Sequence, residues 1–136
     1  MPVGASTAML GSNLSALVTM TLLAQTPPPP YYAVIFSSVR TDDDEPGYAA
    51  AAQRMMELAA SQPGFLGVDS ARAEMGVTVS YWTSLEAIKR WRNHAEHQQA
   101  RQQGRAQWYA AFRVRIARVE RDYGWPESPG QPNRRA

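Results

Sequence analysis

The chain contains no cysteine and only two histidines among its 136 residues. Without cysteine it can form no disulfide, no thiolate nucleophile and no cysteine metal site, and its redox compartment stays undetermined. Lysine is also scarce, because thirteen of the fourteen basic residues are arginine. The available chemistry therefore rests on imidazoles, arginines, hydroxyls and carboxylates.

Charge is divided unevenly along the chain. Residues 1–75 hold three arginines against seven acidic residues, whereas residues 76–136 hold eleven basic residues against five acidic ones. The basic half raises the possibility of nucleic acid binding, but no basic run exceeds two residues. We interpret the excess as a solvated, arginine-rich surface and expect no nucleic acid partner.

The first thirty residues carry no charged side chain. The apolar patch Leu14–Leu23 is shorter than the about 20 residues that span a bilayer, and it lacks the positive flank of a secretory signal. Pro27–Pro30 then imposes an extended linker. We interpret residues 1–30 as disordered, or as an over-called extension with the natural start at Met20, and a targeting sequence is the alternative. A cytoplasmic protein with no membrane partner is expected.

A folded domain is predicted for residues 31–124, and residues 125–136 are interpreted as a disordered tail. The run Tyr31–Phe36 is apolar without alternation, which indicates a strand buried on both faces. Proline after four acidic residues, and the capping-box pair Thr83 and Glu86, mark two helix starts. The predicted elements are a strand at Tyr31–Arg40, a helix at Gly47–Ser61, strands at Phe65–Ala73 and Val77–Trp82, a helix from Thr83 to Gly104, and a strand at Phe112–Glu120.

This order of elements predicts an α+β, ferredoxin-like βαββαβ fold, with an antiparallel or mixed sheet and both helices on one face. The other face of the sheet would be bare, although the strand Tyr31–Phe36 is apolar on both sides. A second copy of the chain is the simplest cover. We therefore expect a homodimer through the sheet faces.

The stretch Gly76–Gly104 combines a strand with a helix and holds the candidate site. At about 100° per residue, Trp91 lies in the middle of the apolar helix face, His94 lies on the flank of that face, and His97 lies about another 60° further out. Trp82 ends the preceding strand and points towards the helices only if Ser80 and Thr78 share its side. These residues are predicted to form one aromatic pocket edged by imidazoles.

Each residue type in this pocket has two interpretations. Imidazoles with a pKa near ~6.5 suit an acid, a base or a donor to a phenolate, but they also serve as structural hydrogen-bonding groups. No third ligand accompanies His94 and His97, so no metal is expected. The tryptophans are core residues or walls for a flat substrate. Arg113 and Arg115 attract an anionic ligand or simply form an exposed strand face.

Four segments resemble the antibiotic biosynthesis monooxygenase (ABM) domain family: YYAVIF (Tyr31–Phe36), QPGFLGV (Gln62–Val68), SYWTSLEAIKRWRNHAEH (Ser80–His97) and GRAQWY (Gly104–Tyr109). The resemblance covers about Tyr31–Gly124 and implies a dimeric α+β barrel. Similar domains include cofactor-free quinone-forming oxygenases, haem-degrading enzymes and isomerases of small signal molecules. Fold alone does not choose among them.

The haem-degrading members use a first-strand asparagine, a tryptophan on the second helix and an iron-binding histidine about three turns later. Trp91 matches their tryptophan. The first strand offers Phe36, Ser37 and Ser38 instead of asparagine, and Arg101 stands ten residues past Trp91. Haem degradation by that mechanism is therefore not expected.

The resemblance instead implies a cofactor-independent monooxygenase that acts on a small aromatic or polyketide-type molecule without metal or flavin. His94 or His97 would be the catalytic base or phenolate partner. The expected pocket walls are Trp82, Trp91, Tyr109 and Phe36. The alternative is a non-catalytic, dimeric protein that binds a small ligand or is associated with stress.

Overall fold

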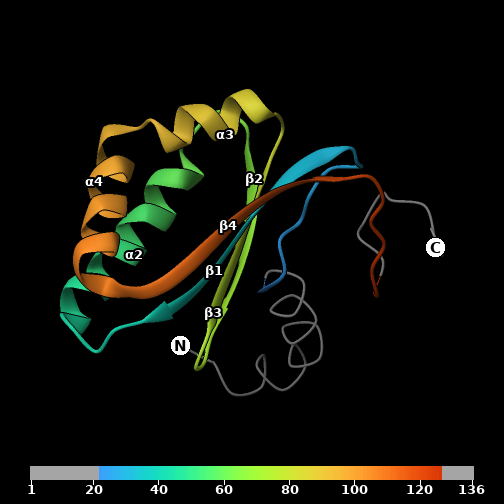
Figure 1. The fold of residues 1–136 in the computed structure, drawn as a ribbon. Helices are drawn as coiled ribbons and strands as arrows, with labels where there is room; N and C mark the ends of the chain where they lie inside the picture. Colours follow the sequence, from blue (N-terminus) through green and yellow to red (C-terminus); the bar gives the residue numbers. More distant parts are fainter. Residues whose placement is uncertain (1–21, 127–136) are drawn as a thin grey trace, which may run out of the picture.

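The computed structural model describes residues 22–126, so the expectations for residues 1–21 and 127–136 lie outside it. Its sheet has the order β2-β3-β1-β4 with every pairing antiparallel, which confirms the predicted ferredoxin-like α+β fold. Helices lie on one side of this sheet (Figure 1). The elements are β1 (Tyr31–Arg40), α2 (Glu45–Ala60), β2 (Phe65–Arg72), β3 (Gly76–Trp82), α3 (Leu85–Arg92), α4 (Ala95–Gln103), the π-helical turn η1 (Gly104–Trp108) and β4 (Tyr109–Val119).

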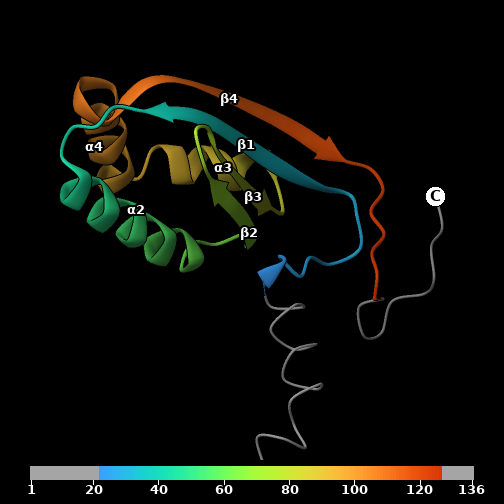
Figure 2. The ribbon, with the colours of Figure 1, turned by 90° about the horizontal axis from the view of Figure 1, so that it is seen from below.

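The strand register assigns each side chain of the sheet to one of its two faces. Tyr32 lies opposite Trp82, and both pack in the cluster under α3, so their side of the sheet is the covered face. The side chains of Tyr31, Ala33 and Ile35, at the alternate positions of β1, point to the opposite face of the sheet, which we call the helix-free face. Seen from below, β1 and β4 run side by side, and α2 lies on the other side of the domain from β4 (Figure 2).

The predicted second helix is interrupted, so the expectation of one continuous helix is wrong. α3 ends at the C-cap Asn93, and His94 is the N-cap of α4 with extended dihedral angles, φ −62° and ψ 134°. The Nδ1 atom of His94 accepts the Glu96 N–H at 3.2 Å, and this local bond competes with a continuous helix. The angular positions of His94 and His97, which assumed a single continuous helix, therefore do not apply.

Both ends of this helical region also differ from expectation. The N-cap of α3 is Ser84, whose Oγ accepts the Ala87 N–H at 3.1 Å, so Thr83 is not the cap. Gly104 does not stop the helix but continues into η1 with helical dihedral angles. It is buried, and a Cβ there would come within 2.9 Å of the Tyr109 ring. The chain then enters β4 at Tyr109, three residues before the expected start at Phe112.

Residues 22–30, part of the segment interpreted as disordered or as an over-called extension, contact the strands of the domain. The Ala24 N–H donates to Asp69 Oδ1 at 2.7 Å, and the Tyr81 hydroxyl donates to Asp69 Oδ2 at 2.8 Å. The Tyr31 hydroxyl donates to Asp122 beyond β4. These bonds tie the segment before β1 and the segment after β4 to the sheet.

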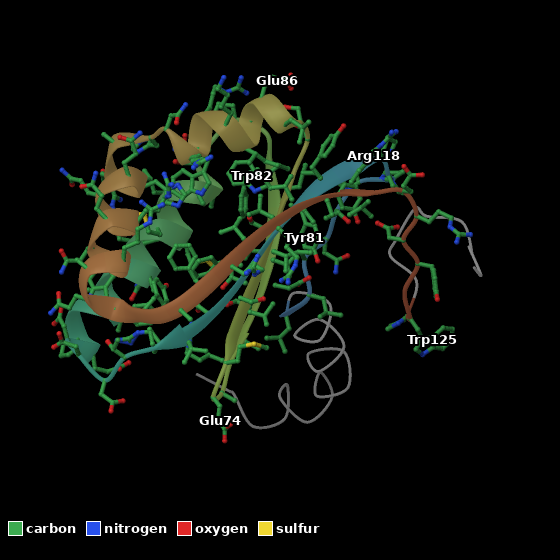
Figure 3. The ribbon with its side chains drawn as sticks, in the orientation of Figure 1. Glu74, Tyr81, Trp82, Glu86, Arg118 and Trp125 are labelled. Atoms are coloured by element: carbon green, nitrogen blue, oxygen red, sulfur yellow. The ribbon has the colours of Figure 1, made fainter. Side chains whose placement is uncertain are left out.

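The hydrophobic core is small and lies under α3. Trp82 is the one large side chain of residues 22–126 that is completely buried, and it packs with Ala87 and Ile88. Trp82 lies on the helix side of β3, whereas the neighbouring Tyr81 lies on the other side (Figure 3). Among residues 22–126, no helix has the length and apolar character needed to cross a membrane.

Candidate functional site

The covered face of the two central strands is not sealed by the helices. Val34 and Phe36 of β1, and Thr78 and Ser80 of β3, point to this face, yet all four are only partly buried. A central strand beneath helices ordinarily has buried side chains. These four side chains therefore keep accessible surface on the covered face.

Four of the predicted site residues come together at the α3 end of this face. The Trp82 and Trp91 rings are stacked with centroids 6.3 Å apart and planes 24° from parallel. The His97 ring lies on Trp91 at 4.2 Å and 13°, and the His94 ring lies 5.9 Å from Trp91. We call these four residues the Trp91 group. The rings of Trp82, Trp91 and His97 stack one after another from the core to α4.

Trp82 packs against Trp91 from inside the core. Its side chain is completely buried, and its Nε1–H donates to Ser80 Oγ at 2.9 Å. Ser80 and Thr78 do share its side of β3, as the strand alternation required. A residue with no exposed surface cannot itself contact a ligand, so Trp82 positions Trp91.

The hydrogen bond of His97 fixes its tautomer. Its Nδ1 lies 2.9 Å from the Trp91 carbonyl oxygen, and a carbonyl oxygen can only accept, so Nδ1 carries the hydrogen. Burial is the main cause that lowers the His97 pKa, and the positive charges of Arg101 and Arg92 lower it further. The neutral ring then has its lone pair on Nε2.

That Nε2 atom is not fully buried. It makes no hydrogen bond to any residue in the range 22–126. No fully buried side-chain nitrogen or oxygen in the same range lacks a partner, so Nε2 must reach accessible space. His97 therefore presents a proton acceptor.

His94 presents a hydrogen-bond donor, whereas His97 presents an acceptor. Its Nδ1 accepts the Glu96 N–H at 3.2 Å, so the neutral ring carries its hydrogen on Nε2. Nε2–H of His94 is a donor, whereas Nε2 of His97 is an acceptor. Both Nδ1 atoms are engaged with the backbone, and residues 22–126 contain no group of three or more His, Cys, Asp or Glu that could hold a metal ion.

The other two predicted site residues, Phe36 and Tyr109, lie further along the covered face. Their ring centroids are 5.3 Å apart, and Phe112 and Tyr48 complete what we call the Phe36 group. Phe36 is four residues along β1 from Tyr32, which is opposite Trp82, so about 13 Å of strand separates the groups. The predicted pocket residues thus form two aromatic groups.

Sequence reasoning did not assign Tyr48 and Phe112 to the site. Tyr48 lies at the start of α2 with the Arg40 guanidinium 3.6 Å from its ring centroid. Burial, followed by a hydrogen bond with Tyr48, raises the pKa of Tyr109. Strand alternation in β4 could have found Phe112, because it is opposite Ser38 on the covered face.

Arg113 and Arg115 are not part of either aromatic group. They are opposite Ser37 and Ile35 in the β1–β4 register, so they lie on the helix-free face, and both are exposed. An anion at the covered face would need other partners.

Comparisons with known proteins agree with this architecture. The sequence profile described as antibiotic biosynthesis monooxygenase matches residues 30–103, so the chain belongs to that family. The uncharacterized protein YqjZ of Bacillus subtilis is 56% identical over 72 residues, which are 52% of this chain and 63% of the relative. The match thus spans less than two thirds of that relative's length.

Solved structures share the fold at low sequence identity. Rv0793 from Mycobacterium tuberculosis has a TM-score of 0.62 at 15% identity, covering 69% of this chain and 99% of that one. SnoaB from Streptomyces nogalater, described as a cofactor-independent oxygenase, has a TM-score of 0.56 at 16% identity, covering 73% and 100%. At these identities the likeness establishes the fold alone.

Proposed function

We propose that the protein is a cofactor-independent monooxygenase of a small, electron-rich aromatic molecule, with His97 as the proton acceptor. The observation that carries this proposal is the hydrogen bond from His97 Nδ1 to the Trp91 carbonyl, which leaves Nε2 as an accessible lone pair. The Trp91 indole, which stacks with both the Trp82 and the His97 rings, gives this atom apolar aromatic surroundings. The family and the oxygenase SnoaB support the same reaction class.

The reaction needs no external reductant. His97 accepts the hydroxyl proton of the enol (anthranol) tautomer of an anthrone-type substrate, in which one methylene hydrogen has already moved to the carbonyl oxygen, and the resulting aryloxide reacts with O₂ at the former methylene carbon. One oxygen atom becomes the new carbonyl and the other leaves as water, so the CH₂ group loses four electrons and O₂ gains four. The protein contributes proton acceptance, orientation and partial exclusion of water.

His94 has a supporting role in this scheme. Its Nε2–H is suited to hold an oxygen atom of the substrate, while its Nδ1 keeps the interruption between α3 and α4 in place. The two histidines are therefore not interchangeable. Loss of His97 removes the base, whereas loss of His94 removes a donor and a helix cap.

The proposed enzyme is a homodimer through its helix-free faces. Ile35, Val77 and Val79 lie on that face and are only partly buried within one chain. A second copy would cover these side chains without blocking the covered face.

Oxygen uptake tests the proposal. The purified protein is given a panel of anthrones and hydroquinones, and wild type is compared with His97→Ala and His94→Ala. We expect His97→Ala to lower the rate by about 100-fold or more, as loss of a general base does, and His94→Ala to lower it less. Binding of the panel without oxygen uptake would instead favour the non-catalytic ligand-binding function. Equal rates for His97→Ala and wild type would exclude His97 as the base.

A further inference from the structure

A row of basic side chains extends from the Trp91 group to the Phe36 group. His97, Arg101 and Arg105 follow one another at intervals of four residues, so they lie on the same side of α4 and η1. Arg101 is partly buried on this side, and the Arg105 guanidinium carbon lies 6.0 Å from the Phe112 ring centroid. The row thus connects the two groups of predicted site residues.

No carboxylate neutralises this row. The ion pairs among residues 22–126 are Arg40–Glu45, Arg54–Glu96 and Arg118–Glu120. Glu96 is the acidic residue of α4, and it is held by Arg54 of α2 in two hydrogen bonds of 3.0 Å. Arg101 instead has Arg92 and Arg105 as charged neighbours, and burial followed by these two charges lowers its pKa. Uncompensated positive charge beside an accessible aromatic surface favours an anionic ligand.

From this arrangement we infer that Arg101 binds the oxyanion of the aromatic substrate, beside the Nε2 atom of His97. The inference rests on the proposed function for the aromatic character of the ligand. When the phenolic proton moves to His97, the negative charge that remains on the substrate oxygen pairs with the guanidinium one helical turn away. Arg101 thereby stabilises the phenolate that reacts with O₂. The preferred substrates are flat aromatics with an ionisable hydroxyl group.

Arg101 also has a structural contact that the test must separate from this role. Its Nη1 donates to the Arg92 carbonyl at 3.5 Å, near the C-terminus of α3, where a positive charge is favourable. This bond is at the outer limit of hydrogen-bond length, and a guanidinium has five N–H donors. The remaining donors are sufficient for an oxyanion. A purely structural role would change stability but not the ionisation of a bound phenol.

The ionisation of bound 2-naphthol tests the inference. The probe is titrated without oxygen, and the naphtholate absorption band reports its pKa free and bound. We expect wild type to lower the pKa of the bound probe by about one unit or more, a tenfold preference for the anion. Arg101→Gln should abolish the shift and Arg101→Lys should keep part of it. Arg121→Gln, an exposed charge beyond the end of β4, is the matched control and should keep the whole shift.

The outcomes separate this inference from the proposed function. An equal pKa of the bound probe in wild type and Arg101→Gln, or no binding by wild type, overturns the assignment of Arg101. Oxygen uptake with anthrones, measured separately, decides the monooxygenase activity. A pKa shift without oxygen uptake leaves Arg101 as the anion site of a ligand-binding protein. Thermal unfolding of Arg101→Gln and Arg101→Lys reports the loss of the contact to α3.

Discussion

The guanidinium of Arg72 lies across Gly76 and donates to both the hydroxyl and the carbonyl of Ser38 on the next strand. A Cβ on Gly76 would overlap that guanidinium. The glycine in β3 is therefore the residue that lets Arg72 of β2 reach β1 over the covered face. Ser38 is 2% exposed, so its hydroxyl depends on this donor.

Gly76→Ala should destabilise the protein by about 1–2 kcal/mol, because the displaced Arg72 leaves the buried Ser38 hydroxyl without its partner. A glycine-to-alanine change in a strand would otherwise be neutral or stabilising. Urea unfolding measures the difference. Gly124→Ala is the control, since a Cβ there meets nothing within 4 Å. Equal stability of the two variants would contradict the role of Gly76.

The buried His97 should make stability depend on pH. Burial lowers its pKa in the folded state, so below the unfolded pKa of about 6.5 the unfolded chain binds the proton more readily. Stability should therefore fall as the pH falls from 6.5 towards the folded pKa, and level off below it. Thermal unfolding between pH 7 and pH 5 should show a smaller decrease for His97→Phe than for wild type. An identical decrease in both proteins would mean that other groups cause it.

Asp69 should hold residues 22–30 against the sheet. Asp69→Ala removes the acceptors of the Ala24 N–H and the Tyr81 hydroxyl, and we expect a loss of about 1–3 kcal/mol together with faster proteolysis of this segment. Asp42→Ala, an exposed acid before α2, is the matched control. Unchanged proteolysis of Asp69→Ala would show that other contacts retain the segment.

The dimer prediction now has a specific target. Val34 and Ile35 point to opposite faces of β1, and the register places Ile35 opposite Val79 on the helix-free face. Ile35→Asp should therefore give monomer in sedimentation experiments, because it places a charge in the proposed interface. Val34→Asp changes the covered face and should leave any folded protein dimeric. A wild type that remains monomeric at micromolar concentration would end this interpretation.

The sequence alone predicted those strands and helices whose apolar residues form a clear run or recur at a regular spacing. β1 follows from the unbroken run that begins at Tyr31, and the β2–β3 hairpin follows from its strand residues and the short connection at Gly76. These signals are repeated over many residues, so one exception does not alter them. The order of elements then restricted the topology strongly.

The interruption between α3 and α4 could not be predicted in the same way. It contains no proline or glycine, and the polar caps Asn93 and His94 are compatible with a continuous helix. Asn93 was a weak signal, since asparagine is common at helix ends. The tautomers of His94 and His97 depend on backbone groups that this interruption exposes, so the difference between the two histidines required coordinates.

The small core under α3 has a consequence for how this protein would respond to its ligand. Trp82 is the one large side chain of residues 22–126 with no exposed surface, and several side chains of the covered face beyond it are only partly buried. A flat aromatic ligand bound between β1 and α4 would therefore bury side chains that the chain itself leaves partly exposed. Its binding energy would add directly to the free energy of unfolding, by about 2.7 kcal/mol at a concentration 100 times the Kd. Melting temperatures measured with each member of a library of aromatic phenols would then identify the compounds that bind, before any reaction is assayed.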